Sequence, residues 1–243
     1  SVLSTVLPHA MRSFPQKILA LQRRRSALAR YQAVIFDLDG TLLDTLEDLA
    51  DSTNFALAAH GFPRRSLEEV RRFVGNGVGN LIRRAVPEGT SPEAVEQCLA
   101  DFKAHYLTNM QNKTHPYPGI PELLKALKAA GCPAAVVSNK FDGAVKGLCR
   151  DYFGGLLPVA LGETPERRKK PAPDLVVSCL GALGVPASGA VYVGDSDVDI
   201  QTAANAGLPC LSVTWGFRDR SFLLEHGATV LAETPQELLW LLL

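Results

Sequence analysis

Five short apolar runs have the length and the β-branched or aromatic content typical of strands that are buried on both faces. They cover residues 33–36, 134–137, 156–161, 190–193 and 210–214. Helical patterns lie between several of these runs and begin or end at Pro or Gly, as helix termini commonly do: 122–130, 174–183 and 197–206. Strand and helix in regular succession predict an α/β fold with a doubly wound parallel sheet, right-handed crossovers and helices on both faces.

One interval breaks this alternation, because residues 45–116 carry helical patterns without a convincing strand. Ser66 with Glu69 predicts a capping box, and Ser91 followed by Pro92 predicts a second helix start. We interpret the interval as an all-helical cap inserted after the first strand, with the turn at 116–119 as a hinge. The predicted organisation is a basic N-terminal extension over 1–30, an α/β core over 31–44 and 117–243, and the cap over 45–116.

The formal net charge of zero is the average of two unlike regions. Residues 1–36 carry six basic and no acidic side chains, which leaves 19 basic and 25 acidic side chains for residues 37–243. The composition of residues 1–30 is typical of an organellar transit peptide, and a basic helix over 15–31 is the alternative interpretation. Because residues 37–243 have no basic excess, we expect neither a nucleic acid nor a membrane as their partner.

The remaining large-scale features are typical of a cytoplasmic protein. The apolar run at 238–243 is far shorter than the ~20 residues that a membrane helix needs. The five cysteines include no C-x-x-C pair, which favours scattered reduced thiols over disulfides or a zinc site. We therefore expect a cytoplasmic monomer or homodimer.

Polar residues follow the apolar runs at the points where the predicted strands end. Asp37 and Asp39 follow the first run, Ser138 follows the second, and Asp195 and Asp199 follow the fourth. In an open parallel sheet these positions share one edge, where ligands bind. A single Asp after a strand is most often a turn former or a helix cap. Several carboxylates at one edge repel one another, however, and a divalent cation such as Mg²⁺ relieves that repulsion.

Four segments together resemble the motifs of the haloacid dehalogenase-like superfamily: 36–42 (FDLDGTL), 138–140 (SNK), 170–171 (KP) and 194–199 (GDSDVD). Residues 73–85 (FVGNGVGNLIRRA), in the helical interval, are similar to the phosphoglycolate phosphatase branch of that superfamily. The resemblance implies a Rossmannoid core with a helical cap. It also implies an Mg²⁺-dependent phosphatase that acts on a small phosphorylated metabolite, 2-phosphoglycolate.

The resemblance implies a role for each motif residue. Asp37 would attack phosphorus and form an aspartyl phosphate, and Asp39 would serve as the acid and then as the base. Ser138 and the Asn139 N–H would hold the phosphoryl oxygens, while Lys170 would neutralise charge. The residues implied to hold Mg²⁺ are Asp37, Asp39 through its backbone carbonyl, Asp195 and Asp199. The residues implied to bind the substrate are Thr41, Asn139, Asn76 and either Arg83 or Arg84.

Other interpretations stay open. A phosphomutase of the β-phosphoglucomutase type, a pyrophosphatase or a sugar-phosphate phosphatase would use the same motifs. A receiver-like phospho-acceptor domain also gathers Asp and Lys around Mg²⁺, but it has no helical insertion after its first strand. Lys169 is the alternative to Lys170 within the basic run 167–170. Asp44 and Asp48 have the spacing of first-turn charges on a helix, and we expect structural roles for both.

Overall fold

The protein was analysed as a computed structural model, which describes residues 29–243. The predicted transit peptide or basic helix lies, up to residue 28, outside the described residues. Six parallel strands form the main sheet in the order β5-β4-β1-β6-β7-β8. The strands are β1 (Ala33–Phe36), β4 (Ala134–Phe141), β5 (Val159–Glu163), β6 (Ala190–Gly194), β7 (Cys210–Val213) and β8 (Leu231–Ala232).

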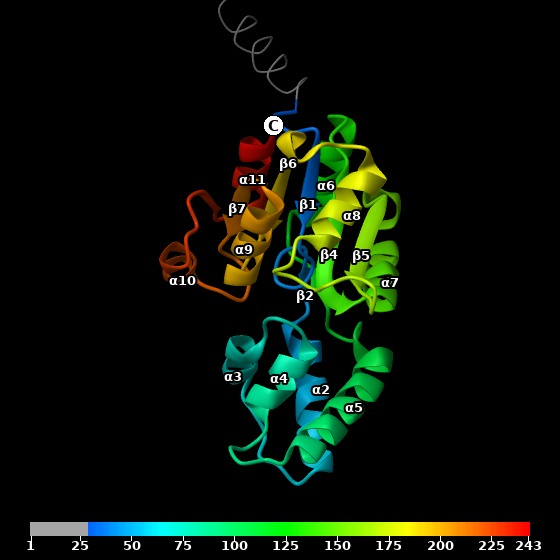
Figure 1. The fold of residues 1–243 in the computed structure, drawn as a ribbon, viewed down its shortest axis with the longest axis vertical. Helices are drawn as coiled ribbons and strands as arrows, with labels where there is room; N and C mark the ends of the chain where they lie inside the picture. Colours follow the sequence, from blue (N-terminus) through cyan, green and yellow to red (C-terminus); the bar gives the residue numbers. More distant parts are fainter. Residues whose placement is uncertain (1–28) are drawn as a thin grey trace, which may run out of the picture.

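Helices cover both faces of this sheet (Figure 1), which confirms the predicted fold class. Side chains alternate along β1, so Val34 and Phe36 enter one apolar cluster and Ile35 enters another. The first cluster includes side chains of α6 (Ile120–Ala129), α7 (Asp142–Phe153) and α11 (Pro235–Leu242), and the second includes side chains of α8 (Asp174–Leu183) and α9 (Asp197–Ala206). The short helix α10 (Arg220–Glu225) lies between β7 and β8.

The bounds of two predicted strands need correction, and one strand was not predicted. The fifth strand of the chain begins at Val159 rather than 156, because a 3₁₀ turn occupies Gly154–Leu156. Strand β4 runs on to Phe141, four residues beyond the apolar run, so polar residues 138–140 belong to the strand. The two-residue strand β8 has no signal in the apolar pattern.

Four helices follow the first strand and make up the segment that we call the helical insertion. They are α2 (Leu46–Ala59), α3 (Leu67–Phe73), α4 (Val78–Ala85) and α5 (Pro92–Asn109), and they share an apolar cluster of their own. The predicted capping box at Ser66 and the helix start at Ser91 are present. A short antiparallel pair, β2 (Leu43–Asp44) with β3 (His115–Pro116), closes the base of the insertion, so the interval 45–116 contains one short strand that was not predicted.

The insertion faces the edge of the sheet at which the strands end (Figure 1). The exact division into a core over 31–44 and 117–243 and a cap over 45–116 stays a prediction. None of the helices within residues 29–243 combines the length and the apolar character needed to cross a membrane.

Candidate active site

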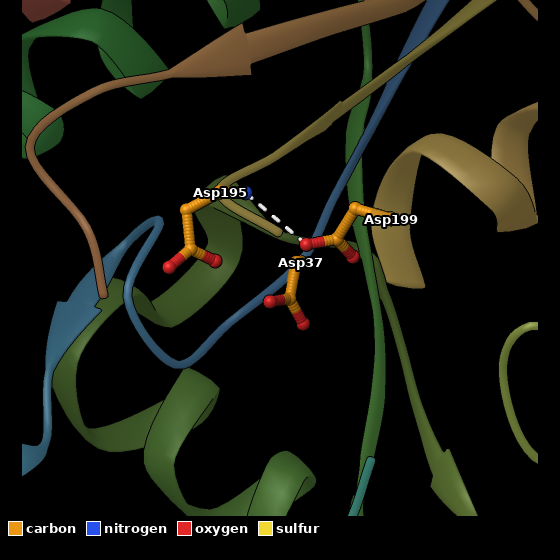
Figure 2. Close-up of side chains that lie close together, drawn as sticks. All are labelled: Asp37, Asp195 and Asp199. Carbon is orange, nitrogen blue, oxygen red and sulfur yellow. Dashed lines mark hydrogen bonds between the residues drawn. The ribbon is translucent and has the colours of Figure 1, made fainter. Parts of the chain in front are cut away.

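The register of the sheet brings three carboxylates together at the ends of neighbouring strands. Phe36 of β1 pairs with Val193 of β6, so Asp37 and Asp195 leave the sheet side by side, and Asp199 follows in the first turn of α9. Each of the three offers a carboxylate oxygen that lies within 4.8 Å of the others (Figure 2). The residues are 8%, 2% and 0% exposed, respectively, so water screens their mutual repulsion poorly.

Lys170 is the cation that the fold places between two of these carboxylates. Its Nζ lies 2.9 Å from Oδ1 of Asp37 and 2.9 Å from Oδ1 of Asp199, and it donates to the Tyr192 hydroxyl at 3.0 Å. The backbone of Lys170 is fixed by Asn139, whose Oδ1 accepts from the Lys170 N–H at 2.7 Å and whose Nδ2 donates to the Lys170 carbonyl at 2.9 Å. The exposed Lys169, in contrast, reaches only the carbonyl of Asn76, at 3.4 Å.

Neutral donors fix the Asp195 carboxylate and the second oxygen of Asp199. Oδ1 of Asp195 accepts from the Thr41 hydroxyl at 3.2 Å, and Oδ2 accepts from the Phe217 N–H at 2.8 Å. Oδ2 of Asp199 accepts from the N–H of Asp195, which is the dashed line in Figure 2, and from the N–H and hydroxyl of Ser196. Thr41 is completely buried against Asp195 and does not line the cavity described below, and its contact with substrate stays a prediction.

The electrostatics of this cluster suit a divalent cation. Burial, reinforced by Asp199, raises the pKa of Asp195 to about 7 against the opposing effects of its hydrogen bonds and of Lys170. Burial and the neighbouring carboxylates Asp199 and Asp195 likewise raise the pKa of Asp37 well above its ordinary value, although Lys170 opposes them. With Asp39 and its partner Lys140 included, four carboxylates face two ammonium groups. The deficit of two positive charges matches one divalent ion.

A cavity of about 100 Å³ opens between this cluster and the helical insertion. Side chains from the strand ends form its floor, and residues 74–78 of the insertion form its roof. Asn76 is part of that roof, with a positive φ of 59°, and its Oδ1 accepts from Nδ2 of Asn139 at 3.4 Å. The predicted residues that the structure brings to the cavity are Asp37, Asp39, Asn76, Ser138, Asn139, Lys170 and Asp195.

Residues 34–213 match the model of the haloacid dehalogenase-like hydrolase family, and this span includes all four motifs. The chain belongs to that family. It is 36% identical over 208 residues to the phosphoglycolate phosphatase of Pseudomonas savastanoi pv. phaseolicola, and the matched region covers 83% of this chain and 74% of the relative. It is 35% identical over 193 residues to that of Rhodobacter capsulatus, which covers 76% of this chain and 85% of the relative.

A solved structure of this family agrees with the fold. The crystal structure of a candidate phosphoglycolate phosphatase from Lactobacillus delbrueckii subsp. bulgaricus superposes with a TM-score of 0.84 at 39% identity, covering 88% of this chain and 98% of that one. The family and the Rossmannoid fold predicted from the four motifs are thus confirmed. The prediction of an enzyme, a phosphatase of the haloacid dehalogenase-like family, is confirmed as well.

Two predicted residues of the insertion, Arg83 and Arg84, do not line the cavity of this family member. Arg83 donates to Oδ1 of Asn80, and Arg84 donates to the carbonyls of Phe73 and Gly75, so both arginines support the insertion's own backbone. Arg84 reaches back to Gly75, a roof residue, but neither guanidinium group lines the cavity, so a contact of either arginine with the substrate stays a prediction.

A different arginine, missed in the sequence, lies at the cavity instead. Arg218 belongs to the loop after β7, lines the cavity, and donates to the backbone carbonyls of Arg71 at 3.1 Å and Val74. Arg71 in return donates to the carbonyl of Gly216 at 2.8 Å, so the insertion and this loop hold each other. The rule that ligands bind at strand ends could have found Arg218, because it applies to the end of β7 as well.

Lys140 was also missed, although it was quoted within a motif. Its ammonium lies 3.0 Å from Oδ1 of Asp39 and donates to the Tyr106 hydroxyl at 2.6 Å. Ser138 and Lys140 are both buried while Asn139 between them is half-buried, and their place in the quoted motif 138–140 was the available signal. The expected structural role of Asp48 fits its contacts, since its carboxylate accepts from the N–H of Lys113 and from the N–H and hydroxyl of Thr114.

Proposed function

We propose that this protein is an Mg²⁺-dependent phosphomonoester hydrolase that acts through an aspartyl phosphate, with 2-phosphoglycolate as its substrate. The observation that carries the proposal is the position of the Lys170 ammonium, 2.9 Å from both Asp37 and Asp199 at the floor of the cavity. A buried cation there opposes the rise in the pKa of Asp37 and so favours the ionised nucleophile, and it lies where negative charge gathers during phosphoryl transfer.

The residues around Asp37 supply the remaining steps. Asp37 attacks phosphorus in line, while the Ser138 hydroxyl and the Asn139 N–H bind the phosphoryl oxygens. Asp39, two residues beyond the nucleophile, protonates the leaving oxygen and then deprotonates the water that hydrolyses the aspartyl phosphate. Lys170 stays beside Asp37 throughout and balances its charge in both displacements.

The same cluster would hold the cation. Asp37 and Asp195 through their carboxylates, and Asp39 through its backbone carbonyl, form an all-oxygen set that suits Mg²⁺. Asp199 supports the set from outside, because its Oδ2 already accepts from three donors and its Oδ1 from Lys170 and Tyr192. A bound Mg²⁺ would withdraw charge from the phosphoryl oxygens.

Two features support a small substrate with a carboxylate. The cavity volume of about 100 Å³ is low against the roughly 300–1,000 Å³ of most ligand pockets, which disfavours sugar phosphates. Arg218 lines the cavity and has guanidinium N–H groups beyond the two that hold Arg71 and Val74, so it is suited to bind a carboxylate. The relatives named phosphoglycolate phosphatase agree with this choice. The cytoplasmic location and the monomer or homodimer stay predictions.

The test is a panel of phosphate compounds with and without Mg²⁺: 2-phosphoglycolate, a sugar phosphate, pyrophosphate and p-nitrophenyl phosphate. We expect Mg²⁺-dependent phosphate release with the highest kcat/KM for 2-phosphoglycolate and none from Asp37→Asn. Full activity of Asp37→Asn would refute the mechanism. A kcat/KM for a sugar phosphate or pyrophosphate that exceeds that for 2-phosphoglycolate would refute the substrate, and transfer to a sugar hydroxyl instead of water would indicate a mutase.

A further inference from the structure

The carboxylate of Asp39 is held quite differently from the other carboxylates of the site. Asp195 and Asp199 are each fixed by several hydrogen bonds, and Asp37 contacts Lys170. Within residues 29–243, the Lys140 ammonium, 3.0 Å from Oδ1, is the one polar side chain in contact with the Asp39 carboxylate. The direction in which Asp39 points therefore depends on where Lys140 is held.

Lys140 is held from its other side by the helical insertion. Tyr106, in α5, accepts a hydrogen bond from Nζ of Lys140 at 2.6 Å, and the same Nζ lies 4.5 Å from the centre of the Tyr106 ring. Tyr106 is 2% exposed and stacks on Phe102 within the apolar cluster of the insertion, with 5.4 Å between ring centres. The ring therefore has little freedom, and its hydroxyl holds the ammonium beside the Asp39 carboxylate.

The charge states are consistent with such a clamp. Burial lowers the pKa of Lys140, but the Asp39 carboxylate and the Tyr106 hydroxyl outweigh burial, so the pKa lies above its ordinary value and the side chain stays an ammonium. Burial raises the pKa of Tyr106, which therefore stays a neutral phenol and accepts the hydrogen bond. Lys140 therefore brings a charged donor, and Tyr106 a neutral acceptor, to their contact.

We propose that Lys140 is a positioning residue that aims Asp39 at the leaving oxygen, and that Tyr106 anchors Lys140, so that the helical insertion supports proton transfer in the core. This inference rests on the proposed function, in which Asp39 is the acid. A carboxylate with free rotation about its side-chain bonds spends only part of its time in the productive geometry, whereas a clamped one is already in place.

The first experiment compares two esters that differ in their need for a proton. An alkyl phosphate such as 2-phosphoglycolate needs protonation of its leaving oxygen, whereas p-nitrophenyl phosphate releases a stabilised phenolate. We compare kcat/KM, which reports on the steps up to departure of the first product. The variants are Lys140→Met, which keeps an unbranched side chain and removes the ammonium, and Tyr106→Phe, which removes only the hydroxyl. Lys146→Met is the matched control on the surface of α7, where Lys146 pairs with Asp142.

We expect Lys140→Met to lose at least tenfold more kcat/KM on the alkyl phosphate than on p-nitrophenyl phosphate. Tyr106→Phe should show the same preference with a smaller loss, about twofold to fivefold, because the ring contact remains. Lys146→Met should retain wild-type values. Equal losses on both esters in Lys140→Met would overturn the proposal, since they would show a role in phosphoryl binding or folding. Wild-type values for Tyr106→Phe would overturn the part that concerns the insertion.

The second experiment does not depend on turnover. In a crystal structure of Lys140→Met we expect the Asp39 side chain to leave its place, while Asp37 and Asp195 keep theirs. An unmoved Asp39 carboxylate would overturn the proposal even if the enzyme is active. A wild-type protein that hydrolyses no phosphate ester would instead refute the proposed function, and a displaced Asp39 would then still show that Lys140 positions it.

Discussion

Replacement of Lys170 by methionine tests the electrostatic balance of the site most directly. The change keeps an unbranched side chain and removes the ammonium that lies 2.9 Å from Asp37 and 2.9 Å from Asp199. At an effective dielectric constant of about 20, each of these pairs contributes about 6 kcal/mol of attraction before the cost of burial is subtracted. Breaking a buried pair costs about 3–5 kcal/mol on balance.

Two quantities should move in opposite directions in Lys170→Met. The free energy of unfolding without a divalent cation should fall by about 3–5 kcal/mol, because two buried carboxylates lose their partner. The affinity for Mg²⁺ should rise, because the cluster changes from two to three uncompensated negative charges. The kcat/KM for 2-phosphoglycolate should fall about 100-fold to 1,000-fold, since a cation beside the transferring group is missing.

Urea unfolding in the presence of a chelator, calorimetric titration with Mg²⁺ and initial rates measure the three quantities. Lys169→Met is the matched control, because it is the same substitution one residue earlier in an exposed position, and we expect wild-type stability and metal affinity from it. An unchanged free energy of unfolding in Lys170→Met, or weaker binding of Mg²⁺, would refute the reasoning.

Three further predictions concern the metal, the substrate and the insertion. The pKa of Asp195 is raised from its ordinary value near 3.8 to about 7, so in metal-free protein this group's contribution to stability is full below about pH 4 and is lost as the pH rises to 7. Mg²⁺ binds the ionised form, so it should raise Tm more at pH 8 than at pH 5.5, and equal shifts in a thermal melt would contradict this. Arg218→Met should raise KM for 2-phosphoglycolate about tenfold to 100-fold with little change in KM for p-nitrophenyl phosphate. The matched control Arg83→Met should leave KM for both esters unchanged. An equal rise in KM for both esters in Arg218→Met would exclude a contact between Arg218 and the substrate carboxylate. Phe102→Ala should lower the free energy of unfolding by about 3–5 kcal/mol in urea titrations, because Phe102 is fully buried in the apolar cluster of the insertion. Phe55→Ala should lower it by less than about 1 kcal/mol, because Phe55 is half-exposed, and equal losses from the two variants would contradict this assignment.

Local patterns predicted the core well because each of its signals is contained in one stretch of chain. The helices at 174–183 and 197–206 have the predicted bounds, since Gly184 and Gly207 end them in left-handed conformations that Gly adopts at low cost. The extent of β4 could not be predicted from the apolar run, because the pairing with β5 shifts its register after Val137 and resumes at Phe141 with Glu163, which the apolar pattern does not report.

Some residues of the candidate site could likewise be placed from the sequence, and others could not. Asp37, Ser138 and Asp195 follow their strands directly, so the parallel topology alone brings them to one edge of the sheet. Thr41 shows the limit of this reasoning. It follows a tight turn after the strand, and its hydroxyl faces Asp195 and not the cavity, which the position in the motif does not report.

The sequence by itself determined the family, the parallel sheet and the set of carboxylates that would hold a cation, because motif order and strand ends are properties of consecutive residues. Only the tertiary structure decided which basic side chains besides Lys170 reach the site. Lys140 depends on Tyr106, 34 residues away in the insertion, and Arg218 depends on carbonyls more than 140 residues away. Contacts of this kind arise where the core and the helical insertion, each with an apolar cluster of its own, meet. No short-range pattern in the chain encodes how the two meet.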